Sequence, residues 1–209
     1  MVLLTFEGID GSGKSTQARL LDEYLQEQGH QTLLVREPGS TTFSERVRDI
    51  LLDSSLNAQP FAELLLFSAA RAQLVTEQIR PALEAGRIVI CDRFYDSTTA
   101  YQGAGRGVAD PDWLAAFHER VTGHLVPDRT FLVEVDPETA RARRTAEEDD
   151  PDRMEAAGSD FYERVGAGYE RLAEQHPDRI QCLDGTRTID DLHRTIRAEV
   201  EAMLDASDS

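Results

Sequence analysis

Residues 2–16 read Val2-Leu3-Leu4-Thr5-Phe6-Glu7-Gly8-Ile9-Asp10-Gly11-Ser12-Gly13-Lys14-Ser15-Thr16. The apolar run at the start is typical of a buried strand, and residues 8–16 fit the phosphate-binding pattern Gly-x-x-x-x-Gly-Lys-[Ser/Thr]. Glycines let such a loop curl until successive backbone N–H groups converge on an anion, at the positive end of the following helix. The stretch therefore predicts a strand, a nucleoside-triphosphate-binding loop and a helix that begins near Lys14.

Two side chains of this loop carry further chemistry. Lys14 brings a compact positive charge to the β- and γ-phosphates, and the Ser15 hydroxyl is expected to ligate Mg²⁺. Lys14 is also the only lysine among 22 basic residues, so its retention points to a chemical role. The residues that we assign to the donor triphosphate are Gly8, Ile9, Asp10, Gly11, Ser12, Gly13, Lys14, Ser15 and Thr16.

Apolar runs alternate with helical patterns along the rest of the chain. The expected strands are residues 2–7, 31–36, 88–92, 129–135 and 179–183, and the expected helices begin near Lys14, Thr42, Pro60, Asp110, Pro137, Ser159 and Thr188. The longest helical pattern, residues 61–83, contains Pro81, which should end or kink it. This order predicts an α/β fold of three layers, of the P-loop NTPase type, with a five-stranded parallel sheet flanked by helices. We find no repeat and no linker, so we expect residues 1–209 to form one domain.

Charge and composition exclude several classes of protein. Thirty-nine acidic against 22 basic residues give a formal net charge of −17, which argues against a general nucleic-acid or anionic-membrane binder. Such self-repulsion is screened by salt, so the charge fits a halophile-like surface in a salty cytoplasm as well as an ordinary acidic surface. The sequence has no apolar run long enough for a membrane span and no secretion signal at its start. Cys91 and Cys182 lie in apolar runs, which is typical of free thiols in a reducing compartment. We therefore expect a cytoplasmic protein.

The residue after the third strand separates the possible uses of the triphosphate. A GTPase normally recognises guanine with an Asn-Lys-x-Asp motif. The only lysine of this chain belongs to the P-loop, so the chain lacks that motif. Hydrolytic ATPases usually place Glu after the acid that ends the corresponding strand, whereas here Asp92 is followed by Arg93. An arginine at this point suits a second anion better than a hydrolytic water. The sequence therefore favours phosphoryl transfer to a phosphorylated acceptor.

Further segments carry a resemblance to a known family. They are Arg36-Glu37-Pro38-Gly39, Leu66-Phe67-Ser68-Ala69-Ala70-Arg71-Ala72-Gln73-Leu74, Asp92-Arg93, Ser97-Thr98-Thr99-Ala100-Tyr101-Gln102-Gly103 and Asp152-Arg153-Met154-Glu155. Together with the P-loop they resemble the thymidylate kinase family, from about Leu3 to Leu204. The resemblance implies a nucleoside monophosphate kinase domain that uses ATP and Mg²⁺ to convert dTMP to dTDP. It also implies a mobile lid at about residues 141–155 and a homodimer built from helices beside the acceptor site.

The resemblance assigns five residues to the base and sugar of dTMP. Phe67 would stack on thymine while Arg71, one helical turn later, donates to a thymine carbonyl. Thr98 and Gln102, also four apart, would hydrogen-bond the base edge if their segment is helical. Tyr101 would crowd the 2′ position of the sugar. A core phenylalanine with a surface arginine, and a merely packed tyrosine, are the structural alternatives for Phe67, Arg71 and Tyr101.

The resemblance assigns five other residues to phosphates and metal. Arg93 would grip the acceptor 5′-phosphate with a planar fork, supported by Arg36. Asp10 would lie near the sugar 3′-hydroxyl and the donor phosphates. Asp92 would hold Mg²⁺ through water or orient Arg93, and Glu37 would join the outer shell of the metal. Asp10 and Glu37 have the simpler alternative of capping a turn.

The arginine that stabilises the transferring phosphoryl group is ambiguous. One branch of the family carries it inside the P-loop, at the position of Gly11, so this chain resembles the branch that supplies lid arginines. Arg143 aligns with the first of these, Arg144 is the second choice, and Arg153 would organise the loop. The family places backbone contacts to adenine where Asp184-Gly185-Thr186-Arg187 stand here. The expected catalytic set is Lys14, Arg93, Arg143, Arg144 and Asp10.

Two other functions remain open on the sequence. The first is a kinase for another pyrimidine nucleotide or nucleoside on the same fold. The second is a nucleotide-dependent switch or ATPase, which would hydrolyse ATP without an acceptor. The missing guanine motif and the arginine after Asp92 argue against the second.

Overall fold

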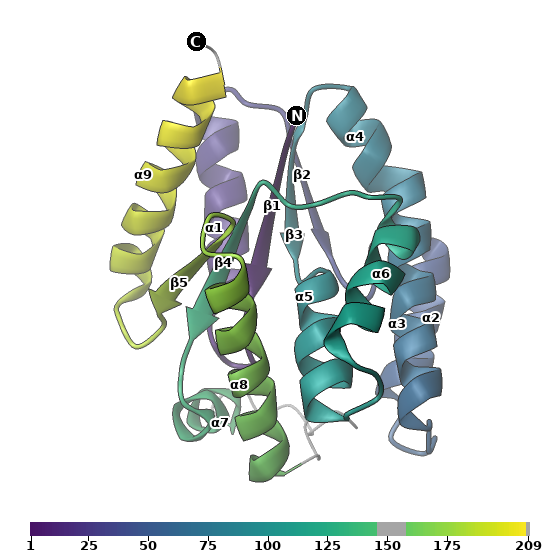
Figure 1. Ribbon diagram of the computed structural model, residues 1–209. Coiled ribbons are helices and arrows are strands. Elements are labelled where there is room, and N and C mark those ends of the chain that lie inside the picture. Colours follow the sequence, from purple (N-terminus) through teal and green to yellow (C-terminus); the bar gives the residue numbers. More distant parts are fainter. Residues whose placement is uncertain (146–157, 208–209) are drawn as a thin grey trace.

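The computed structural model describes residues 1–145 and 158–207 (Figure 1). Its strands form one parallel sheet in the order β2-β3-β1-β4-β5. The strands are β1 (Val2–Glu7), β2 (Thr32–Arg36), β3 (Ile88–Asp92), β4 (Arg129–Glu134) and β5 (Ile180–Asp184). Each lies within a residue of its predicted bounds, and the predicted α/β class with a five-stranded parallel sheet is confirmed.

The helices cover both faces of this sheet (Figure 1). Their bounds are α1 (Lys14–Glu27), α2 (Thr42–Leu52), α3 (Pro60–Leu74), η1 (Val75–Ile79), α4 (Arg80–Glu84), α5 (Tyr95–Thr98), η2 (Thr99–Gly105), α6 (Pro111–Thr122), α7 (Pro137–Thr145), α8 (Ser159–Gln175) and α9 (Ile189–Ser207). Asp110 marks the start of α6 as predicted, because its carboxylate accepts a hydrogen bond from the Trp113 N–H and so caps the helix. Among the described helices, none has the length and apolarity that crossing a membrane requires.

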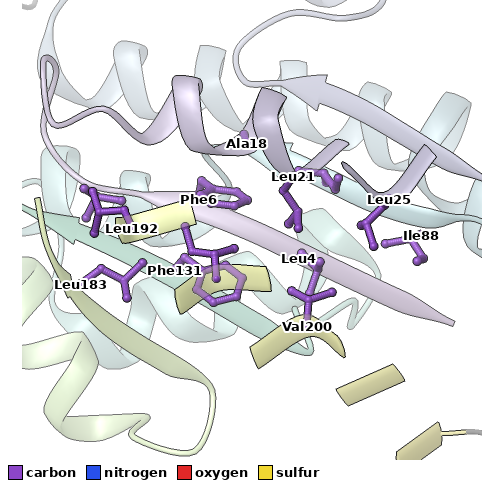
Figure 2. Packing of buried hydrophobic residues seen from close by; sticks show 13 residues of the cluster. Leu4, Phe6, Ala18, Leu21, Leu25, Ile88, Phe131, Leu183, Leu192 and Val200 are labelled. Carbon is purple, nitrogen blue, oxygen red and sulfur yellow. The ribbon is translucent and has the colours of Figure 1, made fainter. Parts of the chain in front are cut away.

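Alternation along the strands separates two hydrophobic layers. Leu4 and Phe6 of β1 point to the face that α1 and α9 cover, where they pack with Leu21 and Val200 (Figure 2). Leu3, one residue earlier, points to the opposite face and packs with residues of α3, η1 and α4. Because successive side chains of a strand face opposite ways, the apolar β1 is buried on both sides, as a central parallel strand should be.

Two segments are π-helical: η1 lies within the helical pattern predicted over residues 61–83, and η2 lies where a helix was only a condition of the Thr98 and Gln102 assignment. The pattern at residues 61–83 continues past Leu74 as η1 and then α4, with Pro81 in the first turn of α4. Proline lacks the N–H that an α-helix needs at that point, and a π turn before it accommodates the loss. The second segment, η2, contains Gln102 and ends with a bond from the Arg106 N–H to the Tyr101 carbonyl.

The carboxyl ends of the strands bring polar residues to one edge of the sheet. Glu7, Arg36 and Asp92 end β1, β2 and β3, and Asp92 is in register with Phe6 on one side and Arg36 on the other. Open α/β sheets bind ligands in the crevice beyond this edge. The fold therefore places the P-loop after β1 and the Asp92-Arg93 pair after β3 side by side.

Candidate active site

A cavity of about 230 Å³ opens beyond the carboxyl ends of β1, β2 and β3. It brings together most of the predicted side chains from segments far apart in the sequence. Its lining contains Asp10, Lys14, Ser15, Arg36, Glu37, Pro38, Arg48, Leu52, Phe67, Arg71, Asp92, Arg93, Ser97, Thr98, Tyr101 and Gln102. The predicted acceptor and metal residues thus share one site with Asp10, Lys14 and Ser15 of the predicted donor loop.

The P-loop shapes the donor end of this cavity. Gly8 adopts φ 138°, and a Cβ at this residue would lie 2.4 Å from the backbone oxygen of Val133, so only glycine fits. The Lys14 side chain is buried, with its Nζ 3.5 Å from both the Ile9 carbonyl oxygen and Asp10 Oδ1. Burial and the charge of Arg93 lower the pKa of Lys14, while Asp10 opposes the shift. Lys14 is therefore held over the loop by weak, long contacts.

Arg93 lies next to the P-loop in an uncommon backbone conformation. Its φ is 71°, and its N–H donates to the Phe6 carbonyl oxygen at 2.9 Å. Its guanidinium donates to Asp10 Oδ1 at 2.5 Å and to Ser97 Oγ at 2.9 Å, and it lies 5.0 Å from the centre of the Tyr101 ring. Left-handed backbone at a non-glycine residue is characteristic of functional sites. The turn thus aims the arginine across the cavity at the donor loop.

Asp10 is the carboxylate between the two cations. Burial alone would raise its pKa, but the charges of Arg93 and Lys14, with hydrogen bonds from Arg93 and Tyr101, outweigh burial and hold the pKa below its usual range. The Tyr101 hydroxyl donates to Asp10 Oδ2 at 3.1 Å. Asp10 is therefore ionised at neutral pH and does more than cap a turn.

A second pair of charges builds the opposite end of the cavity. Arg71 is only 1% exposed, and its Nε donates to Glu37 Oε2 at 2.6 Å. Its terminal nitrogens donate to Thr98 Oγ1 at 2.9 Å and to the Phe94 carbonyl oxygen at 3.1 Å. Arg71 is thus buried in the site rather than at the surface, and Phe67 is half-buried on the same wall.

Burial raises the pKa of Glu37 to about 7, against the opposing charge and hydrogen bond of Arg71. Gln102 lines this end as well, and its amide donates to Glu63 Oε1 at 2.9 Å. Thr98 ends α5 and Gln102 lies in the π-helical η2, and both line the one cavity, although a single α-helix does not join them. Cations, an aromatic face and an amide thus converge where a planar, hydrogen-bonding ring would fit.

The other predicted arginines are less buried or lie outside the described residues. Arg36 is exposed, and its Nη2 lies 3.1 Å from Glu45 Oε2. Arg143 on α7 donates to the Ser12 carbonyl oxygen at 3.2 Å and to the Gly185 carbonyl oxygen at 2.9 Å. The side chain of Arg144, the whole of Arg153 and the part of the predicted lid from residue 146 onward lie outside the described residues.

Comparison with known proteins shows which family has this sequence and fold. The family model described as Thymidylate kinase matches residues 6–196. A thymidylate kinase of Chlorobium chlorochromatii is 49% identical over 97% of this chain and 96% of its own length. One of Deinococcus radiodurans is 45% identical over 95% of this chain and 96% of its own length. The chain belongs to the thymidylate kinase family. The crystal structure of a thymidylate kinase from Ehrlichia chaffeensis superposes with a TM-score of 0.78 and 36% identity, covering 96% of this chain and 98% of that one.

Oxygen atoms of this thymidylate kinase site suit a divalent cation. Asp92 Oδ1 and Glu37 Oε1 are buried without a hydrogen-bond partner, and both residues line the cavity with Ser15. Within the described residues, no group of three or more His, Cys, Asp or Glu side chains forms a metal cage. Mg²⁺ typically uses one or two carboxylates and completes its shell with phosphates and water. The residues present therefore fit Mg²⁺ held jointly with a nucleotide.

Several residues of the thymidylate kinase site were missed by the sequence analysis. Glu7 is buried at the end of β1 and accepts hydrogen bonds from the Phe94 N–H at 2.7 Å, Ser97 Oγ at 2.5 Å and the Tyr169 hydroxyl at 2.9 Å. Burial, together with nearby Asp96, raises its pKa. Glu7 thus fixes the turn that carries Arg93. An acid at the end of an apolar strand was the available signal.

The same turn is held from a second side. Arg179 donates to the two carboxylate oxygens of Asp96 at 2.6 and 3.0 Å, and to Thr130 Oγ1 at 2.8 Å. The Arg93 guanidinium itself contacts Asp10, Ser97, Tyr101 and Tyr169 among the described residues, rather than Asp92. Asp96 and Arg179 lie far apart in sequence, so no local pattern could have paired them.

Proposed function

We propose that this chain, as one nucleoside monophosphate kinase domain, transfers the γ-phosphoryl group of ATP to dTMP and releases dTDP and ADP. The observation that carries the proposal is the shared cavity. Asp10, Lys14 and Ser15 of the P-loop line it together with the buried Arg71, the Phe67 ring and Arg93, whose guanidinium contacts Asp10. Membership of the thymidylate kinase family supports the same reaction.

The chemistry needs alignment more than a general base. The acceptor is a phosphate monoester, whose second pKa near 6 makes it mostly a dianion at neutral pH. Lys14 and Arg93 would hold two mutually repelling anions in line and neutralise charge on the transferring group. Asp10, which is ionised and contacts both cations, keeps them oriented and receives the sugar 3′-hydroxyl in our assignment.

Base recognition follows from the opposite wall of the cavity. Phe67 would stack on thymine, Arg71 and Thr98 would contact its carbonyl edge, and Gln102 its N3 edge. Tyr101, held by Asp10 and Arg93, would exclude a 2′-hydroxyl. A pyrimidine would fit between these groups where a purine would collide.

Ser15, Asp92 and Glu37 would hold Mg²⁺ in this proposal. The ion would neutralise charge on the donor phosphates when bound. Arg36, paired with Glu45, would support the acceptor phosphate. The unpartnered carboxylate oxygens of Asp92 and Glu37 support the assignment.

Arg143 is our choice for the arginine that acts on the transferring phosphoryl group. Its guanidinium donates to a P-loop carbonyl, that of Ser12, so it already lies beside the donor site. Arg144 remains the second choice. An arginine in this role contributes about 10³–10⁵ in rate, so Arg143→Ala should lower kcat far more than the KM for dTMP.

A homodimer through α2, α3 and α6 is part of the proposal. Large apolar side chains are exposed on these helices beside the acceptor site, namely Phe43, Ile50, Phe61, Leu65 and Trp113. The Phe61 and Trp113 rings lie 6.3 Å apart, so the apolar surface continues from α3 to α6. Exposed apolar patches of this kind mark protein interfaces. Light scattering after gel filtration would give the mass of a dimer.

Salt and location complete the proposal. We place the enzyme in the cytoplasm, in keeping with two free cysteines, Cys91 and Cys182. If the net charge of −17 reflects a salty cytoplasm, activity and unfolding temperature should both rise with salt toward 1 M. An ordinary acidic surface would show only the small rise in unfolding temperature that charge screening gives, and no rise in activity.

An acceptor panel tests the reaction itself. ADP release would be followed with dTMP, dUMP, UMP, CMP and AMP, with and without Mg²⁺, across a salt series. We expect the largest kcat/KM with dTMP and little ADP without an acceptor. Preference for another pyrimidine would show that the base site is wrongly assigned, and acceptor-independent hydrolysis would indicate a switch or ATPase.

A further inference from the structure

A buried carboxylate that the reaction does not use lies behind the base end of the cavity. Glu63, in the first turn of α3, is 1% exposed. Its Oε1 accepts a hydrogen bond from Gln102 Nε2 at 2.9 Å and lies 3.5 Å from Arg106 Nε. Arg106 is held in turn over the Phe161 ring, 4.5 Å from its centre. The carboxylate therefore has an amide on one side and a fixed cation on the other.

This arrangement decides which way the Gln102 amide faces. Only the NH₂ end of an amide can donate a hydrogen bond, and Gln102 Nε2 is the atom that faces Glu63 Oε1, with the Arg106 cation beside the same oxygen. The NH₂ group of Gln102 must then point toward Glu63. Gln102 lines the cavity and Glu63 lies behind it, outside the lining, so the amide carbonyl is the polar atom left for a ligand.

The orientation has a consequence for base selection, and the consequence rests on the proposed function. Thymine presents an N3–H between two carbonyl groups, whereas cytosine presents an unprotonated N3 beside an amino group. A fixed carbonyl accepts the thymine N3–H but faces the lone pair of cytosine N3. Arg71, a donor only, likewise suits a carbonyl and not an amino group. We propose that Glu63 is a positioning residue that locks the Gln102 amide and thereby selects thymine over cytosine.

The test is the ratio of kcat/KM for dTMP to that for dCMP, measured on the same preparation. In Glu63→Leu the Gln102 amide loses its fixed partner and is free to present either end, so the ratio should fall about tenfold, the effect of roughly one hydrogen bond. Glu63→Gln should retain most of the ratio, because its side-chain carbonyl can still accept from Gln102 and Arg106. A purely structural role would not change a ratio of two substrates.

Two controls sharpen the result. Glu45→Gln removes a carboxylate that pairs with Arg36 at the phosphate end of the same cavity, so it should affect both nucleotides alike and leave the ratio unchanged. In a Gln102→Leu background, adding Glu63→Leu should change the ratio no further, because the amide through which it acts is gone. If Glu63→Leu does not fold, Glu63→Ala replaces it, since a water in the space both donates and accepts and fixes neither orientation.

The outcomes are separable. A wild type that prefers another acceptor to dTMP defeats the proposed function. A wild type that prefers dTMP, with a ratio unchanged in folded Glu63→Leu or Glu63→Ala, defeats only the role of Glu63. A further fall of the ratio in the Gln102→Leu background would show that Glu63 acts by another route and also overturn the inference.

Discussion

The donor and acceptor ends of one cavity are built in opposite ways. The donor end that we propose is a single run of main chain, residues 8–16, whose glycines at 8, 11 and 13 all have positive φ. The acceptor end is assembled from side chains of α3, the segment after β2 and the segment after β3, joined by a buried Arg71–Glu37 ion pair. The first depends on local backbone geometry, and the second depends on distant segments bringing opposite charges together.

The difference predicts which changes each end tolerates. A main-chain site should fail when a Cβ is added but hardly respond to charge changes elsewhere. A side-chain site should respond to the loss of either partner of a pair, because the remaining charge is left buried. Four substitutions test this contrast, from the largest expected effect to the smallest.

Lys14→Ala removes the cation of the donor loop. Without a cation at the β- and γ-phosphates, kcat/KM should fall about 10³-fold, as for loss of a preorganised charge-stabilising donor. Coupled ADP release with saturating ATP measures it. The unfolding midpoint without nucleotide should change little, because Lys14 is buried with only long contacts at 3.5 Å. Full activity in this variant would refute the role of the P-loop.

Arg71→Ala leaves Glu37 buried without its counter-ion. The free energy of unfolding should fall by about 3 kcal/mol, and the KM for dTMP should rise. Urea denaturation and initial rates measure the two effects. The matched control is Arg71→Met with Glu37→Leu, which should recover most of the stability but none of the dTMP binding. Equal stability loss in the single and double variants would contradict the ion-pair explanation.

Gly8→Ala adds a methyl group at the start of the P-loop, 2.4 Å from the Val133 carbonyl oxygen. The backbone must shift, so we expect a loss of about 3 kcal/mol in unfolding free energy together with weaker ATP binding. Gly86→Ala is the control, since Gly86 also has positive φ but no atom within 4 Å of the added Cβ. It should cost only ~1 kcal/mol. Similar losses at the two sites would mean that the close contact is unimportant.

His118, which packs against α5 and η2, supplies the smallest effect. It is stacked on Tyr95 and contacts Thr99 Oγ1 at 3.1 Å, and burial, with a smaller contribution from Arg71, lowers its pKa to about 3. Below pH 6.5 the unfolded chain takes up a proton that the folded chain refuses, so stability is lost as the pH falls. Between pH 7 and 5 this amounts to ~2 kcal/mol. Urea unfolding at pH 7 and pH 5 measures it: the loss of unfolding free energy between the two should be smaller by that amount in His118→Gln than in the wild type. An equal loss in both proteins would show that His118 is not the group responsible.

The two ends also differ in how well the sequence predicted them. Residues 8–16, the strands and the seven expected helix starts were predicted closely, because each follows from local patterns of apolar spacing, glycine and capping residues, whereas α5 and η2 were not predicted. Phe67, Arg71, Thr98 and Gln102 were predicted to share a site through a resemblance, and they do line one cavity. The pairing of Arg71 with Glu37 and Phe94, and of Gln102 with Glu63, was not predicted, since nothing local pairs them; Glu37 had been assigned to the metal alone.

The sequence by itself determined the parallel sheet, the triphosphate loop and the family, because these depend on residues adjacent along the chain or one helical turn apart. The tertiary structure alone decided that Glu7 and Asp96 fix the turn of Arg93 and that Glu63 stands behind Gln102. It also decided that Glu37 forms a buried ion pair with Arg71. These are contacts between residues far apart in the chain. Their strength comes from burial away from water, and burial exists only once the layers have packed.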